Sequence, residues 1–272
     1  MVAKLGIVAG SGDLPRRLRD AARAAGRPVF ILGLEGFAEP SLTVDTPHGW
    51  IRLGAAADGL EILREEGVRE LVLAGAVRRP SLLALRPDWR TAKFVAKVGM
   101  RALGDDGLLA AIVKELEIEG FKVIGADSIL FSALAPAGLI GRTAPDDLAN
   151  QDLAYGTKVA RALGALDIGQ AVIVQQGVVL AVEAAEGTAA LIARAKALAL
   201  EGPGGVLVKL AKPGQERRAD LPTIGPETIA QAAAAGLRGI VVEAGATLIL
   251  DREATVAAAD AGQLFLIGLT LP

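Results

Sequence analysis

Short apolar segments that alternate with amphipathic helical segments constrain the fold of this chain more than any other feature. Lys4–Ala9 and Pro28–Leu32 have the length and composition of strands, and a helical pattern runs between them from Leu14 to Ala25. A helical segment at Ala57–Glu66 and a third strand at Glu70–Ala74 repeat the unit. Strands that alternate with helices predict a parallel sheet with helices on its faces.

The alternation continues to the end of the chain, with one interruption. The remaining helices of the first half are predicted at Ala92–Ala102 and Asp106–Glu119, before a strand at Phe121–Ile124. Between Phe131 and Pro145 the pattern loosens into Ala, Pro and Gly, and we place a domain boundary there, giving domains 1–135 and 136–272.

The second half opens with a predicted hairpin. Its strands are Gln170–Val174 and Gly177–Val182, flanking Gln175 and Gln176. The segments after it are predicted as helix Thr188–Leu198, strand Gly205–Lys209, helix Glu227–Ala235, strands Gly239–Glu243 and Thr247–Leu250, helix Arg252–Ala259 and strand Gln263–Ile267. The predicted fold class is therefore α/β, with an N-terminal Rossmann-like parallel-sheet domain and a second α/β domain with a mixed sheet.

Composition excludes several classes of protein. The chain has no cysteine, which rules out thiolate metal sites and favours a reducing compartment, the cytoplasm. Its longest uncharged runs are about 15 residues, shorter than the ~20 that a membrane-spanning helix needs. The net charge of -2 and the 3% aromatic content do not fit a nucleic-acid binder. His48 is the only histidine and lies in a turn-like context, so any metal must be held by oxygen.

A glycine-containing loop follows the first predicted strand. Gly10, Ser11, Gly12 and Asp13 stand between this strand and a helix N-terminus, where backbone N–H groups favour an anionic ligand such as a phosphate. The alternative is a tight turn capped by Asp13, with Pro15 in the first helical turn. Gly75, at the end of the third strand, lies where open sheets collect ligands.

Carboxylates occur at other element ends. Gly104-Asp105-Asp106 precedes a helix and is interpreted as a cap, with a metal site as the alternative. Glu183 and Glu243 end strands that lead to the ligand edge of a parallel sheet. Capping explains the neighbouring Glu186 well, and Glu183 less well.

The segment KPGQERRADLPTIGP, residues 212–226, combines charge with prolines and glycines that fix the path of the chain. Lys212, Arg217 and Arg218 offer donors to a phosphate, and Asp220 offers hard oxygen ligands to a Mg²⁺ that substrate phosphates also bind. A solvated surface loop with incidental ion pairs is the alternative. The combination of metal and basic side chains points to phosphoryl chemistry.

These segments also carry a family resemblance. GIVAGSGDLP, DIGQAVIVQQGVVLAVEAAEGT, GGVLVKLAKPGQERRADLPTIGPETI and GIVVEAG resemble the metal-dependent UDP-2,3-diacylglucosamine pyrophosphatase family of lipid A biosynthesis, the type unrelated to the calcineurin-like enzymes. The similarity spans nearly the whole chain. It implies hydrolysis of UDP-2,3-diacylglucosamine to UMP and 2,3-diacylglucosamine 1-phosphate (lipid X) with Mg²⁺, or alternatively Mn²⁺. It also implies two α/β domains that hold the substrate between them in a cytoplasmic homodimer, which meets the inner face of the cytoplasmic membrane only through its lipid substrate.

The resemblance also implies roles for individual residues. Asp220 becomes the first choice for metal binding or catalysis, and Glu183 a second catalytic candidate. The substrate-binding residues are Gly10, Ser11, Gly12, Asp13, Gly75, Gln170, Gly187, Thr188, Lys212, Gln215, Arg217, Arg218 and Thr223. Two positions depart from the family pattern, because Ser11 replaces a common glycine and Glu216 an aspartate. The proton acceptor for the attacking water stays open between Asp220, Glu183 and a metal-bound hydroxide.

Two other functions are compatible with the sequence. A non-catalytic nucleotide-sugar sensor would bind the ligand without turnover. A nucleotide-dependent oxidoreductase would use the first glycine loop, but Pro15 replaces the third glycine of its fingerprint and no acidic residue ends the second strand.

Overall fold

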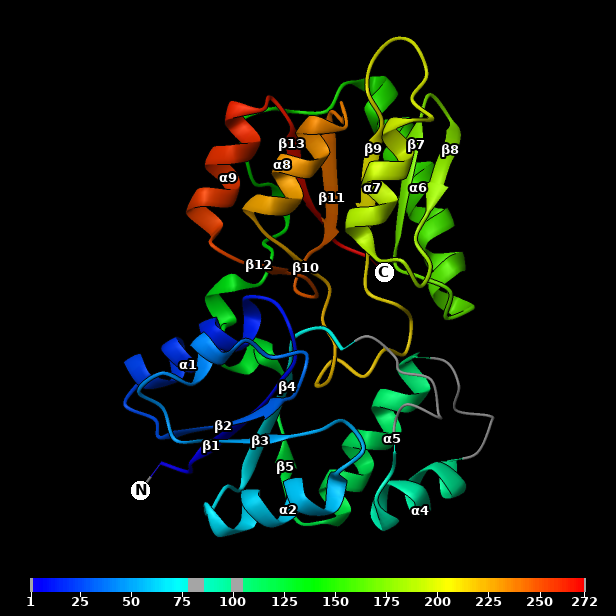
Figure 1. The fold of residues 1–272 in the computed structure, drawn as a ribbon. Helices are drawn as coiled ribbons and strands as arrows, with labels where there is room; N and C mark the ends of the chain where they lie inside the picture. Colours follow the sequence, from blue (N-terminus) through cyan, green and yellow to red (C-terminus); the bar gives the residue numbers. More distant parts are fainter. Residues whose placement is uncertain (1, 78–85, 99–104, 272) are drawn as a thin grey trace. The chain divides into compact units, whose positions relative to one another are not determined.

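The computed structural model describes residues 2–77, 86–98 and 105–271 (Figure 1). The chain divides into two compact units. The first comprises Met1–Leu130 together with Glu216–Asp220, and the second comprises Phe131–Gln215 and Leu221–Pro272. Five residues of the charged segment 212–226 therefore belong to the first unit, although both flanks of the segment belong to the second.

The first unit is built on a five-stranded parallel sheet with the order β3-β2-β1-β4-β5. This order matches five of the six strands of a Rossmann fold, and the point where the order reverses, between β1 and β4, is where such folds bind ligands. The strands are β1 Leu5–Ala9, β2 Val29–Leu34, β3 His48–Ile51, β4 Glu70–Ala74 and β5 Lys122–Val123. The helices are α1 Leu14–Ala24, α2 Ala56–Glu65, α4 Trp89–Val98 and α5 Asp105–Ile118, with short 3-10 turns at Pro40–Thr43 and Ala126–Ser128.

The second unit contains a six-stranded mixed sheet with the order β6-β13-β11-β9-β7-β8. Its strands are β6 Gly138–Leu139, β7 Ala171–Gln175, β8 Val178–Val182, β9 Val206–Lys209, β11 Gly239–Glu243 and β13 Phe265–Leu269. Strands β9, β11 and β13 are parallel, whereas β6 and β7 run antiparallel to their neighbours. A separate two-stranded sheet pairs β10 Thr223–Ile224 with β12 Leu248–Ile249.

Helices cover both faces of this mixed sheet (Figure 1). One face packs against α7 Thr188–Lys196, α8 Pro226–Ala234 and α9 Arg252–Ala261, and the other against α6 Asp147–Ala165; a 3-10 turn lies at Phe131–Ala133. Successive β9 residues alternate between the two cores, with Leu207 on the first face and Val206 and Val208 on the second. No helix among the described residues is both long and apolar enough to cross a membrane.

The structure confirms the predicted fold class and most of the predicted elements. The hairpin is present, with its turn one residue later than expected: Gln176 and Gly177 both have positive φ, as a two-residue type I′ turn requires. Three interpretations were wrong. Strand β2 extends to Leu34 and is directly followed by Glu35, so an acidic residue does stand at the end of the second strand. His48 begins strand β3 and is not part of a turn, and the region before Gln170 contains the 19-residue helix α6, which the sequence analysis missed. The predicted end of a helix at Ala102 and the residue Gly104 lie outside the described residues.

Candidate functional site

One edge of the second unit's sheet gathers several of the predicted residues. Strands β8, β9 and β11 all end there, and β7 starts there, because β7 is antiparallel to both of its neighbours. Glu183 directly follows β8, Lys209 ends β9, and Gln170 precedes β7. Thr188 joins them as the first residue of α7.

A chain of hydrogen bonds links these side chains. The Lys209 ammonium donates to the Thr188 hydroxyl at 2.8 Å, and that hydroxyl donates to Glu183 Oε1 at 2.6 Å. Glu183 Oε2 accepts the backbone N–H of Gln170 at 3.1 Å. Lys209 and Glu183 are only 7% and 5% exposed. Each Glu183 oxygen already accepts a hydrogen bond, so this carboxylate fixes the positions of Thr188 and Gln170.

Gln170 adds an acceptor at the same edge. Its side-chain oxygen is buried and accepts no hydrogen bond from any described residue. Because a buried polar atom without a partner costs stability, such an atom is a feature that a bound ligand can satisfy.

Basic and acidic groups continue this edge beyond β9. Lys212 Nζ contacts Asp167 Oδ1 at 2.6 Å, and the Lys212 backbone N–H donates to Gln215 Oε1. Glu243, at the end of β11, accepts the backbone N–H of Ala211. The sequence motifs pointed to Lys212 and Gln215 but not to Asp167 or Lys209. A lysine that ends an otherwise apolar strand was the available signal for Lys209.

In the first unit, the glycine loop after β1 is hydrogen-bonded to the loop after β4. Gly10 and Ser11 donate their backbone N–H groups to Ala74 and Ala76, and Ser11 Oγ also donates to Ala76. A Cβ at Gly75 would lie 2.6 Å from the Ser11 carbonyl oxygen. Gly10 and Gly75 are thus explained by close backbone contact, and two of the N–H groups expected to face a phosphate are already used.

Asp13 differs from the expected cap. It precedes α1, but its side chain makes no capping hydrogen bond and instead accepts from Arg16 and Arg17. Partial burial opposes ionisation, but the hydrogen bonds from the two arginines outweigh it and lower the pKa of Asp13. The interpretation of Asp13 as a side-chain cap was therefore wrong.

The segment Glu216–Asp220 forms a tight turn. The Glu216 carbonyl accepts the N–H groups of Ala219 and Asp220, and the Glu216 carboxylate receives a two-pronged hydrogen bond from Arg218 at 2.8 and 2.7 Å. Arg218 also donates to Glu117 at 2.6 Å. Leu221 is buried directly after the turn. The backbone around Asp220 is therefore fixed on both sides.

The same contacts shift the pKa values of Glu216 and Arg218. The hydrogen bond from Arg218, opposed by partial burial, lowers the pKa of Glu216, while Glu216 and Glu117 raise the pKa of Arg218. Thr223 follows the turn in β10 and donates to the Leu221 carbonyl. Gly12 and Arg217 lie in loops, and Gly187 immediately precedes α7.

The carboxylates of the segment 212–226 differ in how well they suit a metal ion. Within the described ranges, no group of three or more His, Cys, Asp or Glu side chains could hold a metal ion. Mg²⁺ is often bound by one or two carboxylates together with substrate phosphates, and Asp220 fits that mode. Glu216 does not fit, because both of its oxygens accept hydrogen bonds from Arg218.

Comparison with known proteins covers nearly the whole chain. Residues 4–133 match the model of the LpxI N-terminal domain, and residues 136–267 match that of the LpxI C-terminal domain. The chain belongs to the LpxI family. A curated relative, UDP-2,3-diacylglucosamine pyrophosphatase LpxI of Caulobacter vibrioides, is 44% identical over 98% of this chain and 97% of its own length. The family predicted from the sequence is thus confirmed.

Solved structures resemble this LpxI family member only weakly. Glycinamide-RNase-transformylase T from Mycobacterium tuberculosis is 14% identical, with a TM-score of 0.26, over 66% of this chain and 44% of that one. The biotin carboxylase domain of a thermophilic 2-oxoglutarate carboxylase is 14% identical, with a TM-score of 0.24, over 60% and 43%. Each match spans less than half of the other protein's chain, and similarity this low indicates neither a shared arrangement nor a shared activity.

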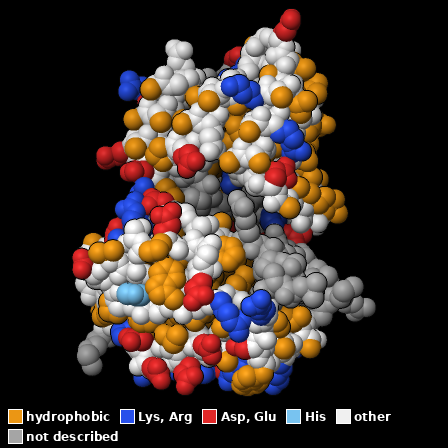
Figure 2. Space-filling model, in the orientation of Figure 1, with side chains coloured by type: hydrophobic (Ala, Val, Ile, Leu, Met, Phe, Trp, Pro, Cys, Tyr) orange, Lys and Arg blue, Asp and Glu red, His pale blue; other side chains and the backbone are white. Residues whose placement is uncertain are grey.

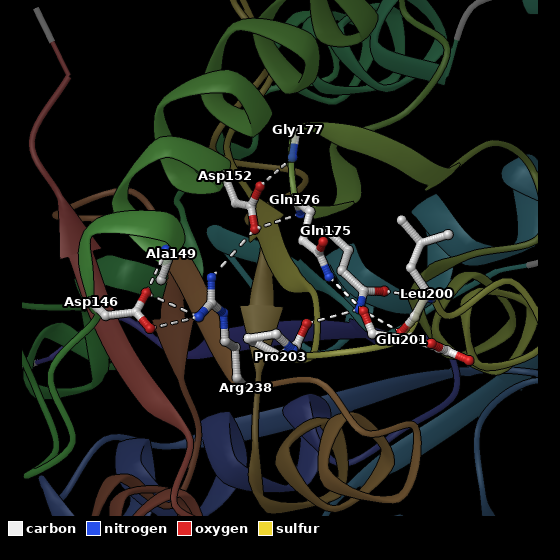
Figure 3. A network of polar contacts seen from close by, with 10 residues as sticks. All are labelled: Asp146, Ala149, Asp152, Gln175, Gln176, Gly177, Leu200, Glu201, Pro203 and Arg238. Atoms are coloured by element: carbon white, nitrogen blue, oxygen red, sulfur yellow. Dashed lines mark hydrogen bonds and ion pairs between the residues drawn. The ribbon is translucent and has the colours of Figure 1, made fainter.

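A second polar network lies at the far end of β7 and β8 from the Glu183 edge (Figure 3). Asp152, which is fully buried, accepts the turn N–H groups of Gln176 and Gly177 and contacts Arg238. Arg238 also binds both oxygens of Asp146, the N-cap of α6. These contacts tie the hairpin turn, α6 and Arg238 to one another, although Arg238 Nε is buried without a partner among the described residues, and we assign the network to the stability of the LpxI C-terminal domain.

Proposed function

We propose that this protein hydrolyses the pyrophosphate bond of UDP-2,3-diacylglucosamine, giving UMP and 2,3-diacylglucosamine 1-phosphate in lipid A biosynthesis. The observation that carries the proposal is the 44% identity, over almost the full length of both chains, to a protein named for this activity. The relative's activity agrees with the enzyme class predicted from the sequence. We further propose that the protein is a cytoplasmic homodimer that acts at the inner face of the cytoplasmic membrane, as the resemblance found in the sequence implies.

Charge neutralisation is the main chemical requirement. A pyrophosphate resists hydrolysis because its negative oxygens repel an incoming nucleophile. Mg²⁺, or alternatively Mn²⁺, would supply positive charge at the phosphate oxygens when bound. Asp220 is the residue we propose to hold it, and Lys212 and Arg217 would bind further phosphate oxygens.

We propose different roles for the two candidate catalytic carboxylates. Glu183 is buried and both of its oxygens accept hydrogen bonds, so we assign it the positioning of Thr188 and Lys209. Asp220 ends the hydrogen-bonded turn and is partly exposed, which suits a group that would accept a proton from water. Gln170, with its unsatisfied oxygen, would accept a hydrogen bond from the substrate.

The test is hydrolysis by the purified protein. UDP-2,3-diacylglucosamine is incubated with Mg²⁺, with Mn²⁺ or with EDTA, and UMP and the sugar phosphate are measured by mass spectrometry. Products with either metal and none with EDTA are expected. Asp220→Asn should lose at least ~100-fold in kcat while melting normally, and Asp58→Asn, at an exposed position on α2, should match the unaltered protein.

A nucleotide-sugar sensor makes the opposite prediction. Binding of the substrate in calorimetry, with no product under any metal condition, would replace hydrolysis by that function.

A further inference from the structure

Helix α4 exposes a tryptophan at its first turn. Trp89 is 65% exposed, whereas the chain's other tryptophan, Trp50, packs its ring against Gly33 in the sheet. Exposing a large aromatic ring to water forgoes much of the stability that burial would bring. An exposed tryptophan held in a regular helix therefore calls for a physical reason.

The residues around Trp89 fix it in this position. Asp88 Oδ1 accepts the Thr91 N–H at 2.7 Å and Asp88 Oδ2 accepts the Ala57 N–H at 2.6 Å, so this carboxylate caps α4 and ties it to α2. Thr91 is buried and donates to the Gly54 carbonyl. Partial burial is outweighed by these backbone hydrogen bonds, which lower the pKa of Asp88. The start of α4 is anchored, and the ring between the two anchoring residues points outward.

Basic and small side chains share the outer face with Trp89. Ala92, Lys93, Ala96 and Lys97 follow Trp89 at helical spacings of three, four, seven and eight residues, and all are exposed. α4 contains no acidic residue. The acids that reach it come from the region of α5, where Glu119 binds Arg90 and Glu115 binds Lys97 at 2.7 Å. Arg90 also stacks 5.0 Å from the Trp89 ring centroid.

We propose that this outer face of α4 docks the protein on an anionic phospholipid surface. Tryptophan favours the boundary between water and lipid, and basic residues near it are attracted by anionic headgroups. The inference rests on the proposed function, because a substrate with two acyl chains resides in a bilayer. Acidic and basic side chains are intermingled over the face drawn in Figure 2, whereas α4 itself contributes basic side chains and no acidic ones.

Trp89 itself provides the measurement. In a Trp50→Phe background its emission reports only α4, and it is recorded with substrate-free vesicles of phosphatidylcholine, alone or mixed with phosphatidylglycerol. A blue shift and co-sedimentation with the mixed vesicles only are expected, both weakened by added salt. Lys93→Glu combined with Lys97→Glu should weaken vesicle binding by about tenfold or more. Lys158→Glu combined with Lys196→Glu, at exposed positions of the second unit, is the matched control.

Several outcomes are decisive. Each variant is first checked for an unchanged melting temperature, and Lys93→Gln alone serves if the double reversal unfolds. Binding that survives the charge reversal, or emission that ignores both vesicle types, overturns the proposal. Binding to polyglutamate but not to vesicles would do so as well and would indicate an acidic protein partner. Hydrolysis of detergent-dispersed substrate, measured separately, should be unaffected, so failure of the proposed function remains distinguishable.

Discussion

Lys209 and Glu183 bind the same hydroxyl group, that of Thr188, and neither is more than 7% exposed. Since the hydroxyl has one proton, donating it to Glu183 leaves Thr188 only as an acceptor toward Lys209. Removing one of two linked buried charges leaves the other uncompensated, at a cost of about 3 kcal/mol or more. Lys209→Met should therefore lower the melting temperature substantially, and Lys209→Met combined with Glu183→Gln should recover much of the loss.

The double-mutant cycle is measured by thermal melts of the three variants. Lys196→Met, on the exposed side of α7, is the control and should melt like the unaltered protein. Additive losses in the double variant would show that the two charges do not depend on each other.

The backbone contact between the β1 and β4 loops gives a second prediction. An alanine at Gly75 must adopt a φ of +90° and place its Cβ 2.6 Å from the Ser11 carbonyl oxygen. Gly67→Ala shares the positive φ but meets nothing within 4 Å. Gly67→Ala should thus cost about 1 kcal/mol from strain alone, and Gly75→Ala clearly more. Equal free energies of unfolding in urea titrations would contradict this account of Gly75.

Local patterns predicted the sheets better than they predicted the site. Apolar runs between helical segments sufficed for the strands, because burial on both faces dictates their composition. Helix α6 was missed, since small and polar residues interrupt its apolar face: Gly156 and Gly164 lie where a Cβ would meet β9 and Lys212. These glycines are explained by close packing of the helix against other parts of the fold. Local sequence preferences do not reveal such packing.

The site shows the same limit. Glu183, Thr188 and Gln170 were predicted because motifs name them, but their hydrogen-bonded order depends on Lys209, which is distant in sequence. Arg218 was expected to face a phosphate, yet it binds Glu216 and Glu117. A sequence indicates which charges are available, whereas which of them pair within the fold depends on the three-dimensional arrangement.

The ionised carboxylate of Glu119 should contribute to stability, and this contribution should be lost in acid. Its hydrogen bond from Arg64, opposed by partial burial and assisted by Arg90, lowers its pKa below the usual 4.5. Because the folded-state pKa is the lower one, the stabilisation is fully present above about pH 4.5 and is lost as the pH falls through the folded value. Glu119→Gln should cost about 1 kcal/mol at neutral pH and progressively less in acid.

Urea titrations across that pH range test the prediction, with Glu61→Gln at an exposed position of α2 as the control. A difference between Glu119→Gln and the unaltered protein that stays constant down to acid pH would show that the ionised carboxylate is not the source of the stability.

Asp152 should affect stability without affecting turnover. It is fully buried, and its oxygens accept the Gly177 N–H at 2.7 Å and the Gln176 N–H at 3.0 Å (Figure 3). Asp152→Ala leaves both N–H groups and the guanidinium of Arg238 short of an acceptor, which should cost about 3 kcal/mol. Asp152→Asn, which keeps one acceptor oxygen, should cost less.

The same substitutions should leave turnover almost unchanged. Because the turn lies at the opposite end of β7 and β8 from Gln170 and Glu183, kcat below the melting temperature should change little. Asp147→Asn, exposed on the same helix, controls for the lost charge, and a kcat that falls in step with stability would mean that the two ends of the hairpin are coupled.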